Sequence, residues 1–161
     1  MSTRAELDVL LASVDQAYNR KSWHGTNLRG SLGRVTARTA AWRPAPERHN
    51  IWELAVHAAY WKYAVWRRLT GAARGSFALK GSNWFTRPGG DASDAAWRAD
   101  VALLNRVHRD LRAAIATVSP RELHRRPAGS KVSTIALITG VAAHDVYHAG
   151  QIQLIKRLAE Q

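Results

Sequence analysis

The 161-residue sequence contains no cysteine, and this absence excludes several kinds of chemistry. The chain has no disulfide framework, no thiolate metal site and no cysteine nucleophile, so any bound metal ion must be held by nitrogen and oxygen ligands. The lack of cysteine also fits a reducing compartment, and we expect a cytoplasmic protein.

Long apolar runs are absent as well. No stretch approaches the roughly 18 consecutive apolar residues that cross a bilayer, and Glu6, Asp8 and Asp15 interrupt the N-terminal segment. We therefore expect neither a membrane span nor a secretory signal. With 46% hydrophobic residues and no internal repeat, residues 1–161 are expected to form one domain that buries its own core.

Acidic residues are scarce, because 12 Asp and Glu stand against 24 Lys and Arg, which gives a net charge of +12. This balance fits either a solvated basic surface or a site for polyanions. The basic residues are scattered, and their densest clusters are only Arg67-Arg68 and Arg125-Arg126. Proteins that track a nucleic-acid backbone usually concentrate such residues on one face. We favour a solvated surface and expect no nucleic-acid partner.

The apolar residues recur at helical spacing and predict four long helices, over residues 3–19, 50–70, 93–119 and 133–159. N-capping residues precede the last three helices: Asn50, Ser93 or Asp94, and Ser133 or Thr134. Gly71 has the position of a helix-terminating glycine. A short helical turn is also expected near Leu28 and Leu32.

A connection of about 20 residues, 72–92, separates the second and third helices and is rich in glycine and small polar residues. A connection of this length allows two consecutive helices to run parallel. We therefore predict an all-α protein, a four-helix bundle with a long crossover connection that is not simply up-down-up-down.

Three histidines are candidates for a metal site inside this bundle. His144 and His148 lie four residues apart on the inward face of the last helix, and His57 lies near the apolar stripe of the second. Two histidines at this spacing bind a divalent cation with little strain. The alternative is that the buried rings are satisfied by a carbonyl, a hydroxyl or a water. Glu53 and Gln151, each one turn from a candidate ligand, are expected to orient the ligands or a bound water.

The remaining histidines have simpler interpretations. His49 is expected to cap a helix or face solvent, and His108 and His124 lie among arginines and are expected to be exposed. His24, in "SWHG", belongs to a surface loop that either stays exposed or closes over a pocket. Asp145 is rotated away from the candidate ligands, so helix capping, packing or a subunit contact is expected for it.

The chain resembles the DinB-like superfamily of bacterial four-helix proteins, which includes metal-dependent hydrolases and low-molecular-weight-thiol transferases. The likeness covers nearly the whole chain through "SWHGTNL", "RPAPERHNIWELAVHAAYW", "DASDAAWRADV" and "LITGVAAHDVYHAGQIQLIKR", in this order. The resemblance implies an up-down-down-up bundle whose second and third helices run parallel. It also implies the metal ligands His57, His144 and His148, and a homodimer.

Three protein ligands leave coordination positions open, which is typical of a catalytic metal site. Zinc and nickel both suit imidazole ligands, and such an ion activates either a bound water or a thiolate. We therefore expect a metal-dependent hydrolase or thiol S-transferase that acts on a small molecule, such as a low-molecular-weight thiol. The alternative is a non-catalytic binding protein with structural histidines and a basic polyanion-binding surface.

Overall fold

The computed structural model describes residues 3–161, within which seven helices and no strand occur. The long helices are α1 (Thr3–Tyr18), α4 (Ile51–Thr70), α5 (Asp94–Ala116) and α7 (Thr134–Ala159). Three short helices lie in the connections: α2 (Leu28–Ser31), α3 (Ala37–Ala41) and α6 (Pro120–Leu123). The prediction of an all-α protein with four long helices is confirmed. Only the third long helix ends clearly earlier than predicted, at Ala116.

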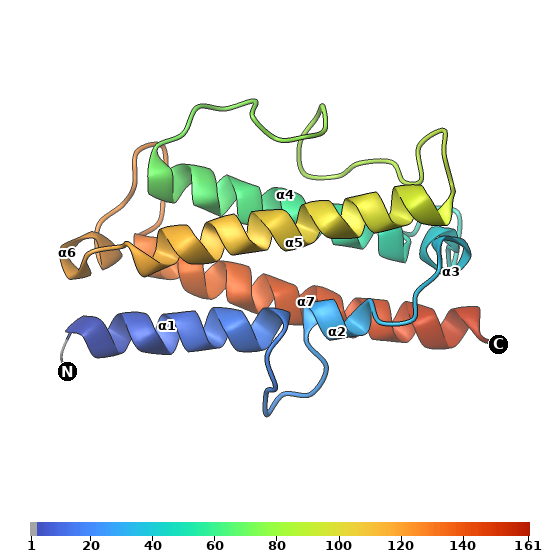
Figure 1. Cartoon of the computed structure of the whole chain (residues 1–161), viewed down its shortest axis with the longest axis horizontal. Coiled ribbons are helices and arrows are strands. Elements are labelled where there is room, and N and C mark those ends of the chain that lie inside the picture. Colours follow the sequence, from blue (N-terminus) through green and yellow to red (C-terminus); the bar gives the residue numbers. More distant parts are fainter. Residues whose placement is uncertain (1–2) are drawn as a thin grey trace.

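Figure 1 shows that α1 and α7 run in one direction and that α4 and α5 run in the other, as an up-down-down-up bundle requires. The segment 71–93 returns along the length of the bundle from the end of α4 to the start of α5. In cross-section, α4 packs against both α5 and α7, and α1 packs against the same two helices. The two helices that carry the candidate histidines are therefore neighbours.

Side-chain caps fix where the long helices begin. The side chains of Asn50, Ser93 and Ser133 each accept a hydrogen bond from the backbone N–H three residues later. Helix α4 ends at Gly71, whose φ of 72° lies in the left-handed region that glycine adopts without a steric penalty. These predicted caps are confirmed.

Each long helix contributes fully buried apolar side chains to the core. Val14, Trp52, Leu104 and Ile138, one from each helix, are at most 1% exposed. Burying a side chain of this kind stabilises the fold by about 1.5–3 kcal/mol. Within residues 3–161, none of the helices has the length and apolar character that crossing a membrane demands.

A buried ion pair joins α4 to α7 beside the candidate metal ligands, because Asp145 directly follows His144 in the sequence. The ammonium group of Lys62 bonds to the carboxylate of Asp145, and the two side chains are 0% and 1% exposed. The same ammonium lies 4.7 Å from the centre of the Tyr18 ring. Asp145 is rotated away from the candidate ligands as predicted, but its role as a buried ion-pair partner is not among those expected for it.

His108 departs from the prediction of an exposed ring. Its side chain is buried and stacks on Tyr18 with a ring-centre separation of 3.6 Å. The neighbouring Arg106 and Arg109 are exposed, because they lie on the outer face of α5. The prediction rested on the neighbouring arginines in the sequence, but His108 lies on the inward face of the helix and is buried there. Burial lowers the pKa of His108 to about 3, so its ring is neutral at physiological pH.

Candidate metal centre

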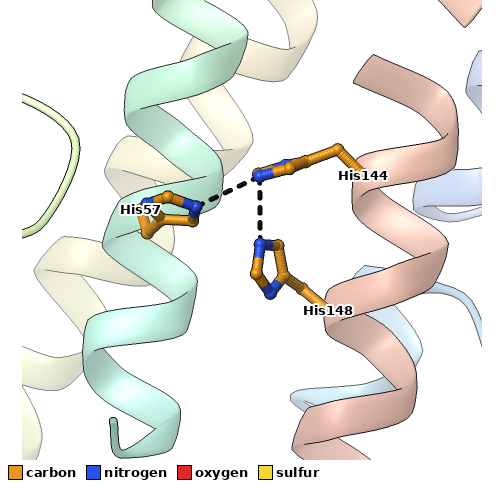
Figure 2. Close-up of side chains that lie close together, drawn as sticks. All are labelled: His57, His144 and His148. Atoms are coloured by element: carbon orange, nitrogen blue, oxygen red, sulfur yellow. Dashed lines mark hydrogen bonds between the residues drawn. The ribbon is translucent and has the colours of Figure 1, made fainter. Parts of the chain in front are cut away.

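Three imidazole rings from α4 and α7 converge on one point (Figure 2). The Nε2 atom of His144 lies 3.1 Å from Nε2 of His57 and 3.0 Å from Nε2 of His148. Nitrogen ligands at 2.0–2.1 Å from a tetrahedral zinc ion are separated by about 3.3 Å. Both separations are close to this value, and all three ligand nitrogens lie within 4.8 Å of one another, so they can share a single ion.

The outer nitrogens of two rings show where their protons lie. Nδ1 of His57 is 2.8 Å from the backbone carbonyl oxygen of Asn83, and Nδ1 of His148 is 2.6 Å from Oε1 of Gln151. Since both partners are oxygen acceptors, each Nδ1 carries a hydrogen and donates it. A neutral ring protonated at Nδ1 keeps a lone pair on Nε2. Both of these lone pairs point at the Nε2 atom of His144.

The three rings cannot satisfy one another while they are neutral. Nε2 of His144 carries at most one hydrogen, and it faces the two lone pairs of His57 and His148. In every neutral arrangement, one Nε2 atom therefore lacks a hydrogen-bond partner among the three rings, and burial makes this unfavourable. A divalent cation accepts all three lone pairs at once. This donor set fits a metal ion better than it fits a hydrogen-bonded cluster of imidazoles.

Burial holds the rings in the neutral form that a metal requires. It lowers the pKa of His57 to about 4 and that of His144 to about 3, and it lowers the pKa of His148 as well. Neighbouring imidazoles lower the first two pKa values further, because protonation of one ring disfavours protonation of the next. At neutral pH the lone pairs are therefore available for coordination.

The crossover segment supplies contacts that helical periodicity could not reveal. Asn83 has a φ of 64°, a left-handed conformation that asparagine tolerates, and it offers its backbone carbonyl to His57. Its side-chain oxygen accepts a hydrogen bond of 3.0 Å from the indole of Trp61. Trp84 stacks on His57 at 3.8 Å and on His49 at 3.6 Å. These contacts hold the His57 ring in place on the side of the crossover.

The two predicted orienting residues have different surroundings. Gln151 bonds directly to His148, which is the contact expected of a group that orients a ligand. Glu53 bonds instead to Arg43, at 2.5 and 2.9 Å, and to His49 at 3.0 Å. Although burial opposes ionisation, these hydrogen bonds lower the pKa of Glu53. Glu53 is therefore an ionised structural partner, with no hydrogen bond to the three histidines in the described part of the chain.

The other histidines lie apart from this centre. His24 is exposed in the loop between α1 and α2, where its Nδ1 atom lies 3.5 Å from the hydroxyl of Ser22. His124 has a side-chain exposure of 65%, which confirms the prediction of an exposed ring. His49 is half exposed and stacks on Trp84, which in turn stacks on His57.

A groove between α4 and α7 leads to the candidate centre. Its volume is about 430 Å³, which is within the range of small-molecule sites. Trp61 and Val65 line it from α4, and Val141 and His144 line it from α7. His144 is the only one of the three converging histidines that lines the groove. Its Nδ1 atom is buried and has no hydrogen-bond partner among the described residues.

The comparison with protein families agrees with this geometry. The model of the DinB superfamily matches residues 3–152, which is most of the chain, so the protein belongs to the DinB superfamily. No curated protein and no solved structure gives a significant match. Family membership and the three converging histidines are both compatible with metal binding, and they leave the reaction and the metal open.

Proposed function

We propose that this protein binds one divalent transition-metal ion through His57, His144 and His148 and uses it as an enzyme acting on a small molecule. The observation that carries the proposal is the convergence of three Nε2 atoms whose lone pairs the neutral rings cannot satisfy among themselves. Zinc and nickel are the proposed metals, because imidazole suits both and the chain offers no thiolate.

The residues around the three histidines would prepare them for coordination. Asn83 and Gln151 accept the Nδ1 protons of His57 and His148, and so keep the Nε2 lone pairs directed inward. Trp84 covers the His57 ring and limits the access of water from that side. When bound, the ion would supply a Lewis acid that activates either a water or a thiolate.

The proposed reaction is hydrolysis or thiol S-transfer. Three protein ligands would leave coordination positions for a nucleophile or a substrate, and the adjoining groove of about 430 Å³ has room for a small molecule. A low-molecular-weight thiol is the proposed co-substrate for the transferase version. A homodimer stays a prediction from the family resemblance.

The test compares metal-loaded wild type with two variants. Protein loaded with zinc or nickel is assayed for hydrolysis of small esters and amides, and for transfer of a low-molecular-weight thiol to an electrophile. We expect turnover that is lost in His57→Ala and on chelation. It should be retained in His124→Ala, which removes an exposed imidazole. Metal binding without turnover on any substrate would contradict the enzyme proposal and favour a non-catalytic binding protein.

A further inference from the structure

The groove between α4 and α7 combines an apolar middle with a basic end. Its middle is formed by Trp61, Val65 and Val141, and His144 lies at one end. Arg68 and Lys131 also line it. Arg68 follows His57 by 11 residues, which corresponds to about 16 Å along an α-helix. Lys131 precedes α7, and His144 lies 10 residues after the first residue of that helix, or about 15 Å along it. Both cations are therefore well separated from the histidines along the two helices, and the apolar residues Trp61, Val65 and Val141 lie between them in sequence.

The two cations of the groove have no acidic partner. No ion pair of Arg68 or Lys131 occurs within residues 3–161, and no Asp or Glu is among the residues that line the groove. Arg68 donates one hydrogen bond, of 2.9 Å, to the carbonyl of Ala64. Its planar guanidinium has five N–H donors, so most of them remain available for an oxyanion.

We infer that this groove binds an amphipathic small molecule with an apolar, ring-sized body and an oxyanionic group. The body packs against Trp61, Val65 and Val141, and the oxyanion pairs with Arg68 and Lys131. The other end of the molecule is thereby directed toward His144. The role of the groove as a substrate site rests on the proposed metal enzyme, whereas binding of the amphipathic anion does not.

A second cavity beside the groove does not reach the candidate metal centre. A cavity of about 580 Å³ lies between α4 and the crossover segment, and it shares Trp61 and Arg68 with the groove. None of the three converging histidines lines that cavity. A molecule bound there would not face the candidate metal centre, whereas a molecule in the groove contacts His144 directly.

Two probes of equal shape test the inference by isothermal titration calorimetry. Naphthalene-2-sulfonate has the apolar body and the anion, and its sulfonate is a weak metal ligand. Methyl 2-naphthyl sulfone keeps the ring and the sulfonyl oxygens but is neutral. We expect metal-loaded wild type to bind the sulfonate at least fivefold more tightly than the sulfone. Failure of the sulfonate to bind, or equal affinities for the two probes, would overturn the inference.

Variants of the basic end show where the anion binds. The double variant Arg68→Gln/Lys131→Gln should bind the two probes equally, with the affinity for the sulfone unchanged. Arg67→Gln is the matched control, because it removes the same charge one residue away and does not line the groove. The preference for the sulfonate should survive in this control. A preference that persists in the double variant would place the anion elsewhere and refute the assignment.

A metal-free variant separates this inference from the proposed function. His148 does not line the groove, so His148→Ala should lose the metal and keep its affinity for naphthalene-2-sulfonate within about twofold. If wild type binds the sulfonate through Arg68 and Lys131 but binds no metal, the proposed function fails and the binding site stands. If it binds metal but shows no preference for the anion, the inference fails alone.

Discussion

Replacing Lys62 with methionine tests the buried ion pair that joins α4 to α7 beside the candidate metal centre. Lys62 and Asp145 are 0% and 1% exposed, and methionine approximates the length of the lysine stem. Removing one partner of a buried pair costs about 3–5 kcal/mol, because the remaining charge is left without compensation. The loss of the contact between Lys62 and the Tyr18 ring adds to this destabilisation.

The expected change in melting temperature follows from the length of the chain. Unfolding 161 residues at about 2.1 cal/mol/K per residue gives an entropy of about 0.34 kcal/mol/K. A loss of about 3–5 kcal/mol therefore lowers the Tm by about 9–15 °C. Circular dichroism during heating, together with urea unfolding at 25 °C, measures both quantities.

Two further variants make this test specific. Lys62→Met/Asp145→Leu removes both charges, and we expect it to recover most of the lost stability, because replacing a whole buried pair with apolar residues is often neutral. Lys80→Met removes an exposed lysine and should change the free energy of unfolding by less than about 0.5 kcal/mol. A loss below about 1 kcal/mol in Lys62→Met, or a double variant no more stable than the single one, would refute the reasoning.

The remaining predictions concern the candidate site and the surface. The metal-free protein should lose stability as the pH falls from about 6.5 toward about 4. In this range the imidazoles of the unfolded chain bind protons, whereas His57 and His144 in the folded protein stay neutral because burial lowers their pKa values. Stabilisation by added metal should fade over the same range, and an equal response to metal at pH 5 and pH 7.5 in urea unfolding would contradict this. Gln151→Ala should weaken metal binding by about 10- to 100-fold in a titration against a competing chelator, and an unchanged affinity would show that its bond to His148 is unimportant. Duplex DNA should bind weakly and only at low salt in fluorescence titrations. Tight, salt-resistant and sequence-selective binding would disprove the interpretation that the basic surface is merely solvated.

The sequence predicted those parts of the fold that depend on local pattern. Helical periodicity and capping residues located the long helices, and a rotation of 100° per residue placed His144 and His148 on the inward face of α7. The resemblance to the family implied the same two residues and His57 as ligands, and the structure brings all three together. Their coordination of a metal stays a prediction.

The rest of the site depends on irregular segments whose conformation has no sequence period. Asn83 and Trp84 reach His57 because the crossover folds back along α4, and only the clustered aromatic residues of "NWF" hinted at such packing. Glu53 was expected to face the ligands. Its carboxylate instead forms a bidentate ion pair with the guanidinium of Arg43, which lies in the irregular segment before α4.

The metal content of protein purified without an affinity tag tests the central claim most directly. After dialysis against zinc or nickel, inductively coupled plasma mass spectrometry should find about one ion per chain in wild type and in His124→Ala. The ion should be lost in His57→Ala and in His144→Ala. No bound ion in wild type, or full occupancy in both of these ligand variants, would contradict the account.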